Sequence, residues 1–292
     1  MTTKISRSPV SFQAVKRMYD NNPVTIDSQR QVFDQVEKVL SSIRIPGEFA
    51  KRKDDKDLID LYCEYRSWVL FSEGLNKIWT TVELHKKNLD GELKLKEFNI
   101  WFSNSSTIPV LHYANISLLM SFITALGLVP RRVRDKELFL VRQRSSYFAV
   151  ERKEYVKQCS IKVSDKNWHE IIIRVSEDTS RQTKFQLQFD QIDCVRRARN
   201  FLDYQILAKD ALILQAGEKD FANCLKVSIS LASDVFNFLT SNLGLEPRNR
   251  AEVRYRVLAA TCNEIIENYS SKSSGPLDKE VPCLAKMACV RS

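Results

Sequence analysis

Residues 130–153, PRRVRDKELFLVRQRSSYFAVERK, mark the point at which the pattern of the chain changes. Before Pro130 the apolar residues recur with helical spacing, whereas from residue 137 onward they alternate with polar ones. Alternation is typical of a strand with one buried face. The same stretch carries eight Arg or Lys residues in 24. It therefore predicts both a change to β structure and a basic surface.

The alternating pattern continues beyond this stretch and predicts an antiparallel β-meander over residues 130–190. The links between the alternating segments are short and polar, and short links join antiparallel neighbours because a parallel pair needs a long crossover. The expected strands are ELFLVRQ (137–143), YFAVER (147–152), CSIKVSD (159–165), WHEIIIRVSED (168–178) and TKFQLQF (183–189).

On the N-terminal side, residues 25–129 have the spacing of a helical region. We expect one helix over residues 25–45 and two over residues 57–86, separated near Gly74. A buried helix follows, with Pro109 in its first turn and Gly127 just past its end, positions that suit these two residues. Residues 92–102 leave helix and strand both open.

On the C-terminal side, helical spacing returns and predicts a bundle over residues 191–269. Its helices are expected over residues 193–214, 220–244 and 249–270. By composition, residues 1–24 form a mobile basic arm and residues 270–292 a flexible tail. The expected fold is therefore α+β and predominantly α-helical, with a helical N-terminal half, a central antiparallel meander and a helical C-terminal bundle.

Composition narrows the classes of function. The 292 residues include only seven glycines, and no G-x-G or G-K-[ST] occurs, so a phosphate-cradling loop is not expected. The formal net charge is +9. A net charge of this sign favours polyanionic partners, namely nucleic acid, an anionic membrane surface or an acidic protein.

The cysteines and histidines do not group into a recognisable site. Seven scattered cysteines without a C-x-x-C spacing are typical of reduced thiols, and they predict a cytoplasmic or nuclear protein that is not secreted. Three histidines far apart in the sequence predict neither a metal site nor a cofactor site. No uncharged apolar run reaches the roughly 18–20 residues that span a bilayer, so no transmembrane segment is expected.

Catalytic signatures are also missing from the sequence. No G-x-S-x-G, H-E-x-x-H or kinase-type motif occurs. His169 lies on an expected strand and is interpreted as a core or rim histidine. Asp90 and Glu92 are too few acidic groups for a metal-dependent nuclease and also make a plain turn. We therefore expect a protein that is not an enzyme.

Basic residues gather in three clusters. Residues 131–160 hold nine positive and four negative side chains, a net +5, while residues 248–256 hold four Arg and one Glu, a net +3. The third cluster is RRAR at 196–199. If Ser145 and Ser146 form a two-residue loop, residue 142 pairs with 149. One hairpin face then carries Phe139, Val141, Phe148 and Val150, and the other carries Arg142, Arg144, Tyr147 and Glu151.

Two interpretations of the Arg/Tyr face remain open. Arginines bind phosphates and an exposed tyrosine stacks on unpaired bases, but the same residues also keep a sheet surface soluble. We favour a non-enzymatic nucleic-acid-binding protein, for RNA or single strands, of a nucleocapsid-like or matrix-like kind that self-associates. The alternatives are a helical adaptor with a basic face for an acidic partner or anionic membrane, and an enzyme acting on an anionic substrate. The candidate residues are Arg131, Arg132, Arg134, Arg142, Arg144, Tyr147, Arg152, Arg250, Arg254 and Arg256.

Overall fold

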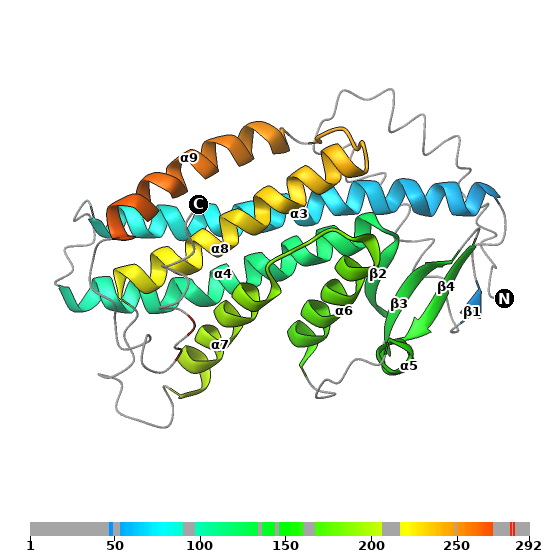
Figure 1. Cartoon of the computed structure of the whole chain (residues 1–292), viewed down its shortest axis with the longest axis horizontal. Helices are drawn as coiled ribbons and strands as arrows, with labels where there is room; N and C mark the ends of the chain where they lie inside the picture. The colour runs from blue at the N-terminus through cyan, green and yellow to red at the C-terminus, as the bar shows by residue number, and fades with distance from the viewer. Residues whose placement is uncertain are drawn as a thin grey trace, which may run out of the picture. The chain divides into compact units, whose positions relative to one another are not determined.

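The computed structural model places most of the chain between residues 47 and 270 (Figure 1). It describes residues 47–48, 53–89, 97–133, 136–143, 146–159, 167–205, 217–248 and 250–270, together with Val281 and Cys283. The expected basic arm, the helix at 25–45, the strand at 159–165 and most of the C-terminal tail lie outside these residues.

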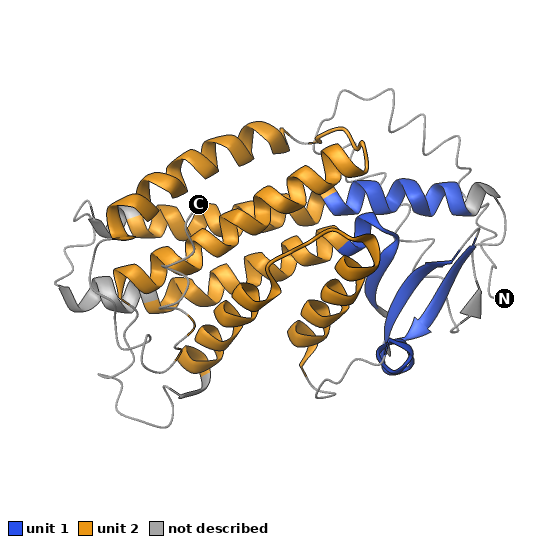
Figure 2. Cartoon of the chain, in the orientation of Figure 1, with its two compact units in different colours: residues 1–67, 123–162 blue, residues 68–122, 163–292 orange. Residues whose placement is uncertain are grey.

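The chain forms two compact units, coloured separately in Figure 2. Unit 1 comprises residues 1–67 and 123–162, and unit 2 comprises residues 68–122 and 163–292. Helices α3 (Lys53–Leu89) and α4 (Glu97–Ala125) each contribute residues to both units. The expected class, α+β and mostly helical with a small antiparallel sheet in the middle of the chain, is confirmed.

Unit 1 is built on an antiparallel sheet of strand order β1-β4-β3-β2. The strands are β1 (Gly47–Glu48), β2 (Leu128–Val133), β3 (Lys136–Gln143) and β4 (Ser146–Glu151). The hairpin of β3 and β4 pairs Arg142 with Tyr147 and Leu140 with Ala149. The expected pairing was therefore wrong by two residues, because Ser146 belongs to β4 and the loop lies before it.

Both faces of this sheet are buried. Leu138, Phe139 and Leu140 are consecutive in β3, so they point to alternate faces, and each is at most 3% exposed. Phe139 packs against Tyr155 of α5 (Arg152–Gln158) with the ring centroids 4.8 Å apart. The opposite face packs on the first turns of α3 through Tyr147. The face expected to be exposed is therefore largely buried, although Arg142 on it is exposed.

Gly74 does not break α3, which continues through it as a single helix. A Cβ at this position would lie 2.8 Å from the Leu118 side chain of α4, so glycine permits the close approach of the two helices. Likewise, Pro109 lies inside α4 and not in its first turn. Gly127 has the positive φ of 81° that a residue just past a helix end adopts, as expected.

Helix α4 is the most apolar helix described. Its segment Ser105–Ala125 has a mean hydropathy of 1.4 and is long and apolar enough to cross a bilayer, while 72% of its most apolar window is buried in the structure. The core helix of a soluble protein has the same properties.

Unit 2 is a helical bundle. Besides parts of α3 and α4 it contains α6 (Trp168–Thr183), α7 (Phe189–Gln205), α8 (Glu218–Asn237) with a terminal π-turn (Phe238–Asn242), and α9 (Ala251–Ser270). Figure 1 shows α8 running beside α9, in agreement with their extensive packing. Phe236 connects three of these helices, because its ring lies 6.1 Å from Trp68 of α3 and 5.2 Å from Tyr255 of α9.

Residues 168–178 form the first part of helix α6, so the strand expected there was wrong. Asn167 caps the helix by accepting a hydrogen bond from the backbone N–H of Glu170 at 3.3 Å. Ile172, Val175 and Ser176 are buried at helical spacing. The β-branched residues resembled a strand pattern, but burial of this stripe outweighs their modest helix propensity. Residues 184–188 likewise form no strand, and Phe189 begins α7.

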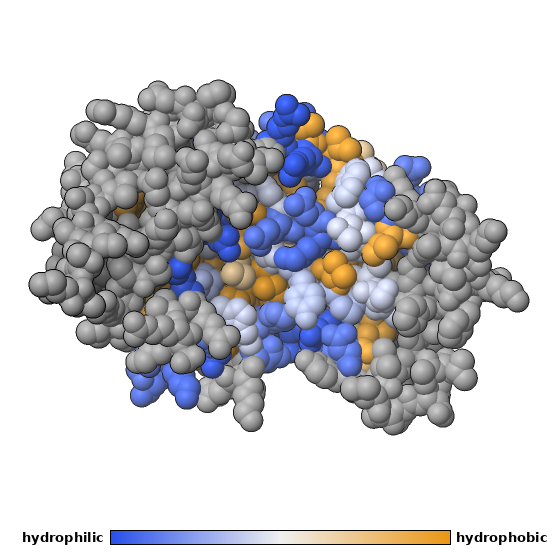
Figure 3. Space-filling model, turned by 180° about the vertical axis from the view of Figure 1, so that it is seen from behind, coloured by the Kyte–Doolittle hydropathy of each residue, from blue (hydrophilic) through white to orange (hydrophobic). Residues whose placement is uncertain are grey.

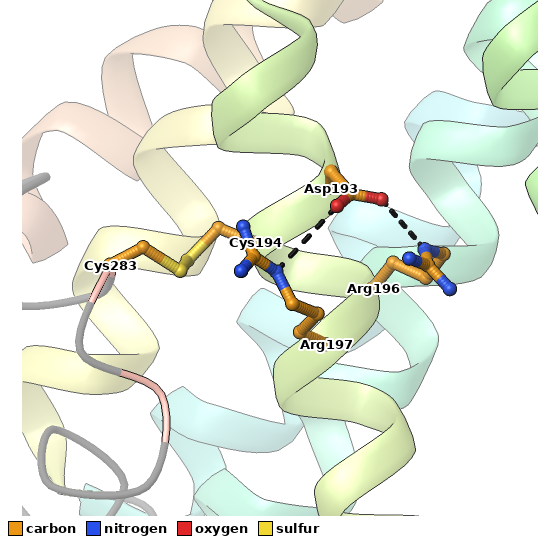
Figure 4. The surroundings of a disulfide bond; sticks show 5 residues. All are labelled: Asp193, Cys194, Arg196, Arg197 and Cys283. Atoms are coloured by element: carbon orange, nitrogen blue, oxygen red, sulfur yellow. Dashed lines mark hydrogen bonds and ion pairs between the residues drawn. A yellow bond between two sulfur atoms is a disulfide. The ribbon is translucent and has the colours of Figure 1, made fainter.

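A disulfide joins Cys194 of α7 to Cys283, 89 residues further along the chain (Figure 4). Cys194 is fully buried, and Val281 near its partner is 4% exposed. The expectation that every cysteine is reduced was therefore wrong for this pair. Sequence spacing could not identify it, because α7 and the C-terminal segment meet only in the folded chain.

We expect reduction of this disulfide to destabilise the protein. A native disulfide typically stabilises a fold by about 2–4 kcal/mol. Cys283→Ser should therefore lower the midpoint of chemical unfolding under non-reducing conditions, and dithiothreitol should lower that of the wild type to the same value. Cys159→Ser is the control, because Cys159 is half-buried and outside the disulfide. Peptide mapping without reductant that finds Cys194 and Cys283 unlinked would contradict the pairing.

Candidate nucleic-acid interface

The arginines of the hairpin cluster that the structure describes are engaged within unit 1. Arg142 pairs with Asp60 of α3 at 3.3 Å, and Arg131 of β2 donates to the Tyr62 hydroxyl at 3.1 Å. Arg152 forms an ion pair with Glu137. The side chains of Arg132, Arg134 and Arg144 lie outside the described residues. Internal pairing leaves the three described arginines with less capacity for a phosphate.

Tyr147 is fully buried and cannot stack on a base. Its hydroxyl donates a 2.7 Å hydrogen bond to Asp60 Oδ1 and lies 3.7 Å from Cys63 Sγ. Burial raises the pKa of Tyr147, and burial also raises the pKa of Cys63 to about 12, so both groups stay protonated. The prediction of an exposed Tyr147 was wrong, because this face of the sheet covers α3.

Tyr147→Phe tests this assignment. Removal of the hydroxyl takes a buried donor from Asp60 and should lower the free energy of unfolding by about 1–2 kcal/mol. Binding to nucleic acid should not change, since the ring is inaccessible. A variant with unchanged stability and weakened binding would contradict the buried position of Tyr147. Both quantities can be measured on one preparation, by denaturant unfolding and by fluorescence anisotropy.

The RRAR cluster is also occupied within the protein. Arg196 pairs with Asp193 at 2.7 Å, and Arg197 pairs with the same carboxylate at 3.6 Å (Figure 4). Arg199 pairs with Asp203 at 2.7 Å. These ion pairs join residues three or four positions apart on α7, which is the spacing of helix neighbours. The cluster is thus a salt-bridged helix surface.

The arginines of the last cluster differ among themselves. Arg256 pairs with Glu252 at 2.5 Å, one turn earlier on α9. Arg250 and Arg254 are both exposed, and within the described part of the chain neither side chain has an ion pair or hydrogen bond. Arg250 directly precedes α9 with a positive φ of 56°, and its carbonyl accepts a hydrogen bond from the Arg254 N–H at 3.0 Å. Both residues line the same groove. These two guanidinium groups are available to an anion.

A groove in unit 2 brings these arginines beside exposed apolar side chains. It encloses about 450 Å³ between α3 and α9. Trp79 is 39% exposed, Val253 is 60% exposed and Val257 is 51% exposed. Figure 3 shows that apolar and hydrophilic residues are interspersed on the coloured part of one face of the molecule. The groove is lined by Leu75, Asn76, Trp79, Arg250, Val253, Arg254, Val257 and Leu258.

The contribution of α3 to this groove was not found in the sequence. Trp79 is one of several apolar residues at helical spacing in residues 57–86, so the spacing alone does not distinguish it from the buried ones. However, the buried positions Leu75, Ile78 and Val82 have the spacing of one face, and Trp79 follows Ile78 by about 100° around the helix. This offset from the buried face was the one feature of the sequence that could have indicated an exposed Trp79. Trp79 lines a groove only because α9 packs beside α3, and α9 begins about 170 residues further along the chain.

A larger hollow, of about 650 Å³, follows the segment between α6 and α7. Its charged lining residues have both signs, and Glu177 there pairs with Arg181 at 2.5 Å.

Within the described residues, no group of three or more His, Cys, Asp or Glu side chains is placed to hold a metal ion. The groove between α3 and α9 is therefore the stronger candidate for an anionic ligand.

His112 of α4 and His169 of α6 form a pair in unit 2, in which His112 is buried and His169 is half-buried. His112 Nε2 lies 3.1 Å from His169 Nδ1, and His112 is 1% exposed. Burial lowers the pKa of His112 to about 3, with the charges of His169, Arg199 and Arg196 acting in the same direction. Sequence analysis placed His169 correctly in or near the core, but on a strand and without its partner.

Acid should destabilise the protein through this pair. Because the pKa of His112 is about 3 when folded and near 6.5 when unfolded, the unfolded chain binds the extra proton between these values. The free energy of unfolding should therefore fall as the pH drops below about 6.5. The slope approaches 1.4 kcal/mol per pH unit for one proton. His112→Gln should show a shallower slope in denaturant unfolding between about pH 6 and 4; equal slopes would contradict the assignment.

Comparisons with family models, curated protein sequences and solved structures each gave no match to this chain. Its site is therefore interpreted from its own residues.

Proposed function

We propose that this protein is a non-enzymatic binder of nucleic acid, for RNA or other single strands, and that the groove between α3 and α9 is its binding site. The observation that carries the proposal is that the exposed arginines Arg250 and Arg254 line the same groove as the exposed ring of Trp79. Within the described residues, neither arginine has an ion pair or a side-chain hydrogen bond. Arginine side chains bind phosphate oxygens, and aromatic rings at the same site suit unpaired bases.

The charge of the whole chain supports the same proposal. A net charge of +9 attracts a polyanion over distances comparable with the Debye length and raises the rate of encounter. Many of the arginines are already paired within the protein, as the RRAR cluster illustrates. Arginines that lack such partners are then the preferred contacts for a ligand. Self-association on a nucleic-acid strand, as in a nucleocapsid-like protein, is part of the proposal.

A second candidate function is favoured by Val253 and Val257. Aliphatic side chains exposed by 60% and 51% on one helix face suit a groove that binds an amphipathic helix of a protein partner. Such a helix would carry acidic residues opposite Arg250 and Arg254. This alternative corresponds to an adaptor with a basic face.

The proposal is tested with a fluorescently labelled oligouridylate across a salt series. The log of the affinity should fall linearly with the log of the salt concentration. Arg250→Gln/Arg254→Gln should weaken binding at least about tenfold at low salt, and it should reduce the magnitude of the slope by about 1.4, since two phosphate contacts on a single strand are lost.

Lys153→Gln/Lys157→Gln is the matched control. Both lysines are exposed on α5, four residues apart, and neither has an ion pair within the described residues. This variant removes the same two charges from unit 1. It should bind nearly as well as the wild type. Equal losses in the two variants would contradict the groove as the site, and a wild-type protein that binds no oligonucleotide at low salt would overturn the proposed function.

A further inference from the structure

We infer that the groove between α3 and α9 holds an unpaired base, with Trp79 as the stacking platform and Asn76 as the group that contacts the base edge. This inference rests on the proposed function and assigns the ligand chemistry of the same site. Such a groove would bind the base as well as the phosphates, unlike a basic surface that binds phosphates alone.

The first step is the position of Trp79. Its side chain lines the groove, is 39% exposed, and has no aromatic partner within the described part of the chain. By contrast, Trp68 on the same helix is fully buried and packs against Phe71 at 5.7 Å. An exposed indole ring offers the large π surface on which bases stack in single-strand binding proteins.

The second step is the polar chemistry around that ring. Asn76 is exposed, lies one turn before Trp79 on α3, and lines the same groove. Its side-chain amide carries both donors and an acceptor, as the edge of a base requires. Arg250, directly before α9, and Arg254 of α9 line the groove and supply positive charge for the adjoining phosphates.

The third step is the apolar floor. Leu75 is 2% exposed and Leu258 is 1% exposed, and both line the groove. A base that enters it therefore meets aliphatic contacts besides the indole ring. The volume of about 450 Å³ lies within the range of small-ligand sites. A paired base has its edge engaged and both faces stacked, so the groove selects single strands.

The selectivity is tested with two probes of equal charge, an oligouridylate of about ten nucleotides and an abasic oligomer of the same length. The uridine oligomer should bind about five- to a hundred-fold more tightly than the abasic one, because only it can stack. Equal binding of the two probes would overturn this inference and leave the proposed function standing. Binding of neither probe would overturn both.

The role of Trp79 is tested on the same probes. Trp79→Leu should weaken binding of the uridine oligomer about five- to a hundred-fold and leave the abasic oligomer unchanged, whereas Trp79→Phe should restore part of the affinity. Leu84→Ala is the control, since Leu84 is 43% exposed on α3 and does not line the groove.

Tryptophan fluorescence gives a second readout that does not depend on affinity. The chain has four tryptophans, of which only Trp79 is proposed to stack on a base. Saturating uridine oligomer should therefore quench the fluorescence of the wild type, and this quenching should largely disappear in Trp79→Phe. Quenching that persists in this variant would contradict stacking on Trp79. An affinity loss in Leu84→Ala as large as that in Trp79→Leu would also contradict it, because a general loss of apolar surface would then explain the result.

Discussion

The carboxylate of Asp60 joins the sheet of unit 1 to helix α3 and engages one of the arginines of the hairpin. It accepts a hydrogen bond from the buried Tyr147 hydroxyl at 2.7 Å and pairs with Arg142 at 3.3 Å. A buried hydroxyl needs such a partner, because an unsatisfied polar group costs about 1–3 kcal/mol. The interaction holds β3 and β4 on α3, and it turns toward the protein a face that carries both an arginine and a tyrosine. Within the described part of the hairpin, Arg142 thus has an internal acidic partner.

Unit 2 likewise contains arginines that pair with acidic residues of the protein and arginines that do not. On α7, Asp193 pairs with Arg196 and Arg197, and Asp203 pairs with Arg199. At the start of α9, Glu252 pairs with Arg256, whereas Arg250 and Arg254 have no ion pair within the described residues. The two unpaired arginines at this site are therefore a local feature, although the net charge of +9 belongs to the whole chain. Their position beside Trp79 makes the groove chemically different from the other basic clusters.

Packing constraints explain the main departures from the expected secondary structure. Gly74 was expected to separate two helices, but α3 continues through it because α4 packs there with Leu118 against the glycine. Residues 168–178 were expected to form a strand from their β-branched residues. They form a helix, since the stripe of Ile172, Val175 and Ser176 is buried and Asn167 supplies a cap. In both places a tertiary contact outweighs a local preference.

The sequence by itself determined the class of the fold, the hairpin of β3 and β4, the three C-terminal helices α7, α8 and α9, and the basic character of the start of α9. These features depend on periodicity and turn residues, which are local properties. Only the tertiary structure decided the register of the hairpin, the burial of Tyr147, the link between Cys194 and Cys283 and the groove that joins Trp79 to Arg254. The reason is that each of these depends on a contact between residues far apart in the chain. The sequence does not distinguish an arginine that is free to bind a ligand from one that is paired within the protein, because the difference depends on where an acidic neighbour lies in the folded chain.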